Sequence, residues 1–138
     1  DRKRAATHFQ TQELGVVVVL VDTSIWIDHL RAGNQQLEAL LFDTEVACHP
    51  FIIGELACGN LKNRDEILNL LQALPSTPTI APDEFLFFVD RHRLMGLGIG
   101  FVDVHLLASA RLSDLLLWTD DKRLQAAASR LGIDFPNP

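Results

Sequence analysis

Four carboxylates lie where the local pattern predicts apolar surroundings: Asp22, Glu55, Asp103 and Asp121. Each follows an apolar strand-like run or lies on the apolar side of a predicted helix. A buried charge without a partner is costly, so buried carboxylates are usually paired with a cation or bound to a metal. No matching set of Lys and Arg residues accompanies these acids in the sequence. The pattern therefore indicates divalent-metal chemistry.

Electrostatic repulsion makes the same point. Two carboxylates about 5 Å apart repel by roughly 3 kcal/mol at an effective dielectric constant near 20. A convergent group of four therefore needs either protonation of some members or a bound cation. An all-oxygen ligand set suits Mg²⁺ or Mn²⁺ better than zinc. The histidines form neither HxH nor HExxH spacing, which argues against a zinc site.

Simpler explanations exist for three of the four acids. An Asp that follows a strand often caps the next helix, which would account for Asp22 and Asp121. Asp103 would be favoured in the first turn of a helix by the helix dipole. Glu55 shares a helical face with Phe51 and Ile52, where core side chains are expected.

The expected secondary structure alternates between strands and helices. Strands are expected at residues 16–21, 45–48, 77–80 and 115–118, and helices at 24–31, 35–42, 50–58, 64–74, 82–94, 101–112 and 121–131. Ser24 is expected to cap the first helix, and Asn63 with Glu66 to form a capping box. This alternation predicts an α/β fold with a parallel, doubly wound sheet. Ligands bind such sheets outside the carboxyl ends of the strands, where Asp22 and Thr119–Asp121 lie.

Length and composition predict a single soluble globular domain of 138 residues, with 48% apolar and 22% charged residues. Residues 1–15 are polar and without periodicity, so we expect a non-native or disordered extension before a domain at 16–138. Cys48 and Cys58 form no CxxC pair and are expected to be reduced core residues of a cytoplasmic protein. The longest apolar run, residues 14–21, is far shorter than the ~20 residues of a membrane span, so we expect no membrane association.

The net charge of −6 argues against a general nucleic-acid-binding protein, because phosphate contacts require basic surface. It does not exclude a nuclease, since metal ions would neutralise part of the acidic charge. RNA would then bind through local basic groups. One candidate group consists of Arg91, His92 and Arg93, and another, beside the suspected site, consists of Lys122 and Arg123. The alternative is that both are solvated helix faces.

Other chemistries fit the sequence less well. The glycine-rich stretch Gly96–Gly100 is not GxxxxGK[ST] and follows no strand. Ser24 and Ser109 lack the GxSxG elbow of serine hydrolases. An aspartyl-phosphate phosphatase would need DxD after the first strand, but position 24 is serine.

Four ordered sequence blocks resemble the PIN-domain ribonucleases, specifically the VapC-type toxins of bacterial toxin–antitoxin pairs. The blocks are Val19–Asp28, Gly54–Leu56, Gly98–Ala108 and Leu117–Asp121. The resemblance implies a three-layer α/β/α domain with a central, mainly parallel sheet. It also implies a Mg²⁺- or Mn²⁺-dependent endoribonuclease that hydrolyses RNA phosphodiester bonds.

The resemblance further assigns roles to residues. The family's acidic quartet falls on Asp22, Glu55, Asp103 and Asp121, and its small hydroxyl position on Thr119. Asp22 and Asp103 are the expected direct metal ligands, with Glu55 and Asp121 acting through waters or at a second ion. Ser24 and Thr119 are expected to orient carboxylates or water. Asp120 competes with Asp121 as the fourth acid, and Asp121 is favoured because it lies two residues after the threonine.

The implied partners are an RNA substrate, a second copy in a homodimer, and an antitoxin that blocks the acidic pocket. Two alternatives share the fold. One is an RNA-processing nuclease that is not a toxin. The other is a catalytically silent PIN-like binding module.

Overall fold

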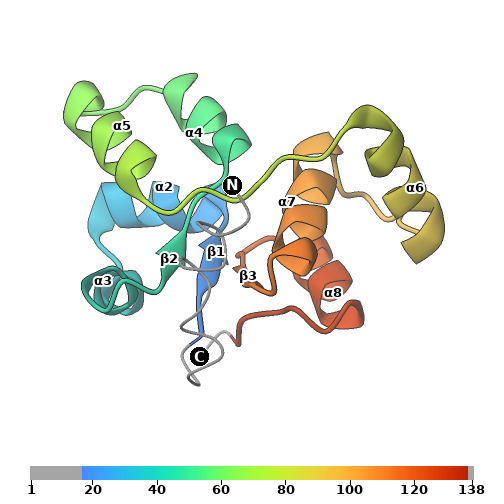
Figure 1. Cartoon of the computed structure of the whole chain (residues 1–138). Helices are drawn as coiled ribbons and strands as arrows, with labels where there is room; N and C mark the ends of the chain where they lie inside the picture. Colours follow the sequence, from blue (N-terminus) through green and yellow to red (C-terminus); the bar gives the residue numbers. More distant parts are fainter. Residues whose placement is uncertain (1–16, 137–138) are drawn as a thin grey trace.

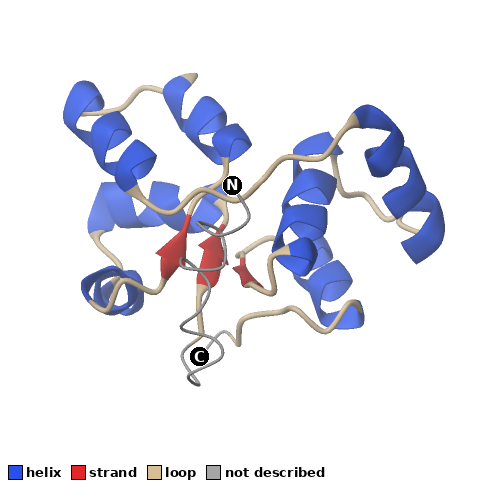
Figure 2. Cartoon of the chain, in the orientation of Figure 1, coloured by secondary structure: helices blue, strands red, loops and turns tan. Residues whose placement is uncertain are grey.

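A computed structural model describes residues 17–136 of the chain. Its sheet contains three short parallel strands, β1 (Val19–Val21), β2 (Val46–Ala47) and β3 (Leu116–Trp118), in the order β2-β1-β3. They lie at the centre of the molecule (Figure 2). Single parallel bridges from Cys48 to Ser76 and from Leu117 to Asp134 extend the pairing at both edges. The expected extension at residues 1–15 lies outside the described residues.

Helices cover both sides of this sheet (Figure 1). One side carries α2 (Thr23–Ala32), α3 (Gln35–Phe42), α4 (Pro50–Ala57) and α5 (Arg64–Ala73), and the other α6 (Pro82–His92), α7 (Phe101–Leu112) and α8 (Lys122–Arg130). The strand order with right-handed crossovers requires this division, because the chain moves outward from β1 to one edge and then returns to the other. The predicted three-layer α/β/α architecture is confirmed.

The core explains why the strands are continuous apolar runs. All three residues of β1 are fully buried, because helices cover the sheet on both faces. On α7, every residue from Val104 to Ala110 is buried. Three of the predicted acids lie at the carboxyl ends of β1 and β3 and at the start of α7, and are therefore attached to elements that form the buried core.

The helices agree with the sequence more closely than the strands do. Observed bounds of α3 and α7 match the predicted ones. The predicted strand at 77–80 is wrong, since pairing there is limited to the bridge at Ser76. Pro75 and Pro78 flank that bridge, and proline has no backbone N–H to donate to a strand ladder.

Two predicted helix caps are also wrong. Ser24 lies inside α2, whose N-cap is Asp22. Asn63 is the N-cap of α5 but has a left-handed backbone (φ 53°) and makes no side-chain cap bond. One half of a capping box occurs instead at α6, where Glu84 Oε1 accepts a hydrogen bond of 2.9 Å from the Ala81 amide.

The two cysteines differ in environment. Cys48 is buried beside β2, as predicted, but Cys58 is exposed at the end of α4, so its prediction as a core residue is wrong. The apolar face of α4 is covered only as far as Leu56. Within the described part of the chain, no helix has the length and apolar character needed to traverse a lipid bilayer.

Candidate active site

The carboxyl ends of β1 and β3 lie side by side. The Asp22 amide donates to the Trp118 carbonyl at 2.9 Å, which continues the pairing one residue beyond β1. Asp22 and Thr119 are consequently the first residues beyond two adjacent strands. This is the edge at which ligands bind parallel α/β sheets.

Asp22 is the most buried of the four predicted acids, with 6% of its surface exposed. Its Oδ2 accepts hydrogen bonds from Ser24 Oγ at 2.9 Å and from Thr119 Oγ1 at 2.7 Å. Although Asp22 is the N-cap residue of α2, its side chain makes no cap bond. Helix capping therefore does not explain this carboxylate, which is held by neutral hydroxyl groups from two elements.

Both hydroxyls also accept hydrogen bonds from the turn that follows β3. Ser24 Oγ accepts from the Asp120 amide at 3.1 Å, and Thr119 Oγ1 accepts from the Asp121 amide at 3.0 Å. Each hydroxyl thus connects the Asp22 carboxylate to the 119–121 backbone. The turn that carries the candidate fourth acid is fixed relative to the first.

Asp121 is exposed and caps α8. Its Oδ1 accepts from the amides of Arg123 and Leu124 at 2.9 and 3.0 Å. The capping explanation therefore does apply to Asp121, as it does not to Asp22. The cap also fixes the direction of the carboxylate, because one oxygen is committed to the helix.

Asp103 lies in the first turn of α7 and is half-buried. Its Oδ2 accepts from the Gly100 amide at 3.0 Å. Burial raises the pKa of the Asp103 carboxyl, the bond from Gly100 opposes that rise, and the negative charges of Asp22, Asp121 and Glu55 raise the pKa further. Asp103 is thus close enough to all three other acids to feel their charges.

Glu55 is exposed, so the prediction that it occupies a core position on α4 is wrong. The periodicity of α4 identifies its apolar face, but only Ile52 and Leu56 on that face are buried. Glu55 Oε1 accepts a hydrogen bond of 2.7 Å from Thr23 Oγ1. Sequence reasoning missed Thr23, although its position directly after Asp22 is a usable signal.

Asp120 faces a different neighbour. Burial, a hydrogen bond to the Asp28 carboxyl, and the negative charges of Asp28 and Asp22 all raise the pKa of Asp120. Asp28 is itself ion-paired with Arg31 at 2.9 Å. It is Asp121, and not Asp120, whose charge raises the pKa of Asp103. Asp121 therefore interacts electrostatically with Asp103, whereas Asp120 interacts with Asp28 and Asp22.

The donor set fits a hard divalent cation in its chemistry, since every contributing group is a carboxylate or hydroxyl oxygen. In residues 17–136, the ion pair within 4 Å is Arg31–Asp28, so no described arginine or lysine neutralises any of the four acids. The ligand shell is not closed, however. Across the same residues, no three acidic, histidine or cysteine side chains lie close enough together to hold an ion. The acids share one electrostatic field without forming a compact cage.

The predicted basic groups lie in two places. Lys122 and Arg123 are exposed in the first turn of α8, beside Asp121. The Arg123 side chain lies against Gly98, where an added Cβ would approach Arg123 Nη1 to 2.6 Å. Arg91 is in the last turn of α6 and Arg93 follows that helix. That group is not beside the acids.

A family profile described as the PIN domain matches residues 19–130. The chain belongs to the PIN-domain family. Two relatives from Mycobacterium tuberculosis, strains CDC 1551 / Oshkosh and ATCC 25618 / H37Rv, both named Ribonuclease VapC32, are each 50% identical over 117 residues. Those matches cover 84% of this chain and 94% of each relative.

A solved structure shows the same fold at lower similarity. The crystal structure of PAE2754 from Pyrobaculum aerophilum superposes with a TM-score of 0.55 at 20% sequence identity. The match covers 80% of this PIN domain and 79% of the other chain. It supports the three-layer architecture alone.

Proposed function

We propose that this PIN domain is a divalent-metal-dependent endoribonuclease that hydrolyses RNA phosphodiester bonds and acts as the toxin of a toxin–antitoxin pair. The observation that carries the proposal is the acidic edge, where Asp22, Asp121 and Glu55 all raise the pKa of Asp103. The 50% identity to proteins named Ribonuclease VapC32 supports RNA as the substrate.

The proposed ion is Mg²⁺ or Mn²⁺. When bound, such an ion lowers the pKa of a water and stabilises negative charge on the phosphoryl oxygens. We assign Asp22 and Asp103 as its direct ligands and Glu55 and Asp121 as ligands through water. Glu55 and Asp121 suit that role because both are exposed and each already has one oxygen hydrogen-bonded.

Ser24 and Thr119 are assigned as positioning residues. Both donate to Oδ2 of Asp22, so we assign Oδ1 of that carboxylate to the metal. A carboxylate held by two donors loses little further freedom when it binds an ion. Hydrogen-bond partners of this kind typically change metal affinity or activity by about 10–100-fold when removed.

The proposed partners are RNA, an antitoxin and a second copy of the chain, in the cytoplasm. A hollow of about 580 Å³ beside Glu55 supports an antitoxin site next to the acids. Its lining is largely apolar and includes Ile27, Leu30 and Leu56, and Lys62 in the same lining supplies a positive charge for acidic groups. Exposed apolar side chains on α6, Leu86 and Phe87, support the homodimer as a surface that association would cover.

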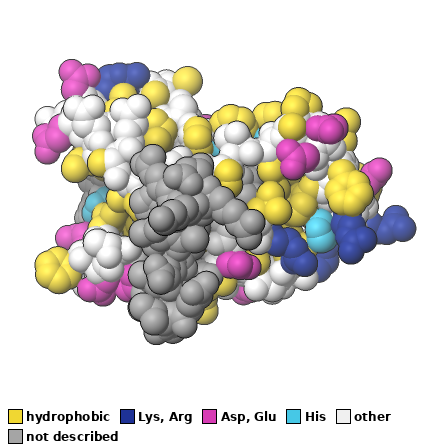
Figure 3. Space-filling model, viewed as in Figure 1, with side chains coloured by type: hydrophobic (Ala, Val, Ile, Leu, Met, Phe, Trp, Pro, Cys, Tyr) yellow, Lys and Arg dark blue, Asp and Glu magenta, His cyan; other side chains and the backbone are white. Residues whose placement is uncertain are grey.

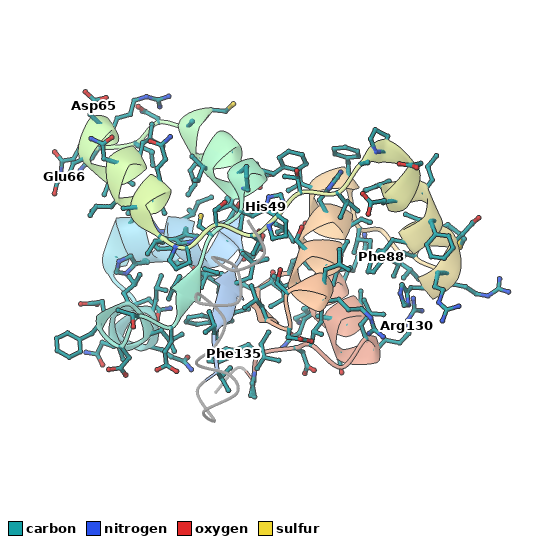
Figure 4. All side chains as sticks on the ribbon, in the orientation of Figure 1. His49, Asp65, Glu66, Phe88, Arg130 and Phe135 are labelled. Carbon is teal, nitrogen blue, oxygen red and sulfur yellow. The ribbon has the colours of Figure 1, made fainter. Side chains whose placement is uncertain are left out.

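The test compares Asp22→Asn and Asp103→Asn with a matched control. Asp65→Asn on α5 removes the same charge on the side of the molecule away from α7 (Figure 4). We expect each site variant to lower RNA cleavage at least about 100-fold, since metal stabilisation of the reacting phosphate is worth several kcal/mol. The control should cleave as the unsubstituted chain does.

Three other outcomes would change this conclusion. Unchanged cleavage in both site variants would reject the acidic edge as the catalytic site. If cleavage depends on the acids but expression does not arrest growth, the protein is an RNA-processing nuclease and not a toxin. If no RNA is cleaved and calorimetry detects no Mn²⁺ binding, it is a catalytically silent binding module.

A further inference from the structure

Four arginines gather around His92 at the end of the molecule where α6, α7 and α8 finish. They are Arg91, Arg93, Arg111 and Arg130, here called the basic cluster. Burial lowers the pKa of His92, and the positive charges of Arg111, Arg91 and Arg130 lower it further. All three arginines are therefore near its ring. Arg130 Nη2 donates to the carbonyls of His92 at 2.6 Å and Arg93 at 3.2 Å. Figure 3 shows basic side chains massed around a histidine at this end, and Figure 4 places Arg130 there with Phe88.

Helix termini explain part of this arrangement. Basic residues near helix C-termini interact favourably with the helix dipole, and Arg130 satisfies two carbonyls at the end of α6. Arg93 is the C-cap residue of α6 and has a left-handed backbone (φ 51°), a conformation in which glycine or asparagine costs less.

The basic cluster has no internal counter-charge. Asp90 and Asp114 are close to it in sequence, but the ion pair found within 4 Å among residues 17–136 is Arg31–Asp28, in another part of the fold. The chain as a whole carries a net charge of −6. A concentration of unneutralised arginine on an acidic protein favours a polyanionic ligand.

The positive charge continues from the basic cluster toward the acidic edge. Arg123 and Arg130 are seven residues apart on α8 and so lie on the same face, with their Cα atoms separated by about 10 Å. Arg123 packs against Gly98, in the segment that leads from Arg93 to the first turn of α7. Asp103 is in that turn.

We propose that the basic cluster binds the RNA backbone several nucleotides away from the scissile bond, with Arg123 between it and the catalytic carboxylates. The inference rests on the proposed ribonuclease function and extends it by assigning a direction to the substrate. Guanidinium groups bind phosphate in a planar, two-pronged geometry that does not depend on the identity of the base. The site therefore contributes affinity for long RNA rather than base recognition.

The first measurement is binding without cleavage. Asp22→Asn supplies a silent background, in which fluorescence anisotropy follows a labelled single-stranded RNA of about 20 nucleotides, well above the roughly 4–16 nucleotides that single-strand sites occupy. Arg91→Gln with Arg93→Gln removes two exposed charges and spares Arg130, which caps α6. We expect the affinity at low salt to fall about 10-fold. Each phosphate contact to a single strand contributes about 0.7 to the slope of log K against log salt. The loss of two contacts should therefore decrease the magnitude of that slope by about 1.4.

The matched control is Asn69→Asp with Gln72→Glu, which lowers the net charge by the same two units at exposed positions of α5. We expect this pair to change RNA affinity less than two-fold. Equal loss in both pairs would mean that net charge alone matters and would overturn the proposal. Selective loss in the control pair would place the RNA on the opposite side and would also overturn it. Circular dichroism of both pairs checks that the fold is kept.

Cleavage by the chain with Asp22 intact separates this proposal from the nuclease function. The expected result is a rise in KM for the Arg91/Arg93 pair that is several-fold larger with a 20-nucleotide RNA than with a 4-nucleotide one. Efficient cleavage with no length dependence would refute the basic cluster and leave the nuclease intact. RNA binding that depends on the cluster, without any cleavage, would uphold the cluster and refute the nuclease. Preferential binding of a polyglutamate peptide over RNA would overturn the cluster as an RNA site.

Discussion

His49 makes the fold sensitive to acid. Its imidazole is fully buried between α4 and α7 (Figure 4), where Nδ1 accepts from the Phe51 amide at 2.9 Å. Its Nε2 lies 3.2 Å from Ser109 Oγ, which donates its proton to the Pro78 carbonyl at 2.8 Å. Because that hydroxyl proton is already used, Nε2 must carry the imidazole hydrogen and donate it. Both ring nitrogens are thus satisfied only in the neutral state.

The free energy follows from the pKa. Burial, and to a smaller extent the positive charge of His105, lower the pKa of His49 to about 4. The unfolded chain has a histidine pKa near 6.5, so between about pH 6.5 and 4 it binds more protons than the folded protein. Stability is therefore lost as the pH falls through this window. The loss from His49 is roughly 2 kcal/mol between pH 7 and pH 5, and approaches about 3 kcal/mol at pH 4.

The assay is denaturant unfolding at pH 7 and pH 5 of the unsubstituted chain and of His49→Asn. Asparagine is a good N-cap residue, so it retains an acceptor for the Phe51 amide while removing the titrating ring. We expect the variant to be less stable at pH 7 but to lose about 2 kcal/mol less on acidification. Equal losses in the two proteins, or an NMR titration of folded His49 near its ordinary pKa, would refute the reasoning.

Three other substitutions test the support of the acidic edge. Gly98→Ala should lower the unfolding free energy by about 1–2 kcal/mol, because Gly98 has φ 77° and an added Cβ would meet Arg123. The measurement is thermal unfolding, and the control is Gly54→Ala, where the space around an added Cβ is open. Thr119→Val should lower RNA cleavage about 10–100-fold through loss of the bond to Asp22, and Thr119→Ser should restore it. Asp103→Asn should not lower the denaturant midpoint at pH 7 in chelator, because burial and the neighbouring acids raise the pKa of Asp103 and so disfavour its charge. A clear loss of stability in that variant would show that the Gly100 bond outweighs them.

Sequence periodicity predicted correctly those features that are determined within a single segment of the chain. The continuous apolar runs of β1 and β3 and the apolar stripe of α7 are local signals, and they placed Asp22, Thr119 and Asp103 at the correct ends of their elements. The prediction that Glu55 occupies a core position was wrong. A helical stripe shows which side of a helix is apolar, but it does not show how much of that side a neighbouring element covers. The prediction that Cys58 is a core residue was wrong for the same reason, since Cys58 lies exposed at the end of α4.

Hydrogen-bond partners were harder to predict than positions. Ser24 has a residue type typical of an N-cap, but its hydroxyl bonds the Asp22 carboxylate, because the turn after β3 brings Thr119 and Asp120 against it from 95 and 96 residues away. The basic cluster was only half predicted. Arg91 and Arg93 are only two residues apart in the sequence, whereas Arg111 and Arg130 join them through the packing of three helix ends.

In the described part of the chain, the carboxylates of the acidic edge are held by neutral hydrogen-bond donors and not by cationic side chains. This difference has a chemical consequence. The described hydrogen bonds to its carboxylates come from Ser24, Thr119 and Thr23 hydroxyls and from backbone amides, including that of Gly100. Neutral donors fix a carboxylate in place but leave its charge, whereas an arginine in the same position would cancel the charge that attracts a metal ion. The four clustered arginines are kept at the other end of α7 and α8, where they can attract phosphate without competing for the same acids. An arginine introduced at Thr23 should therefore abolish divalent-ion binding, measured by Mn²⁺ calorimetry, even if Glu55 remains in place.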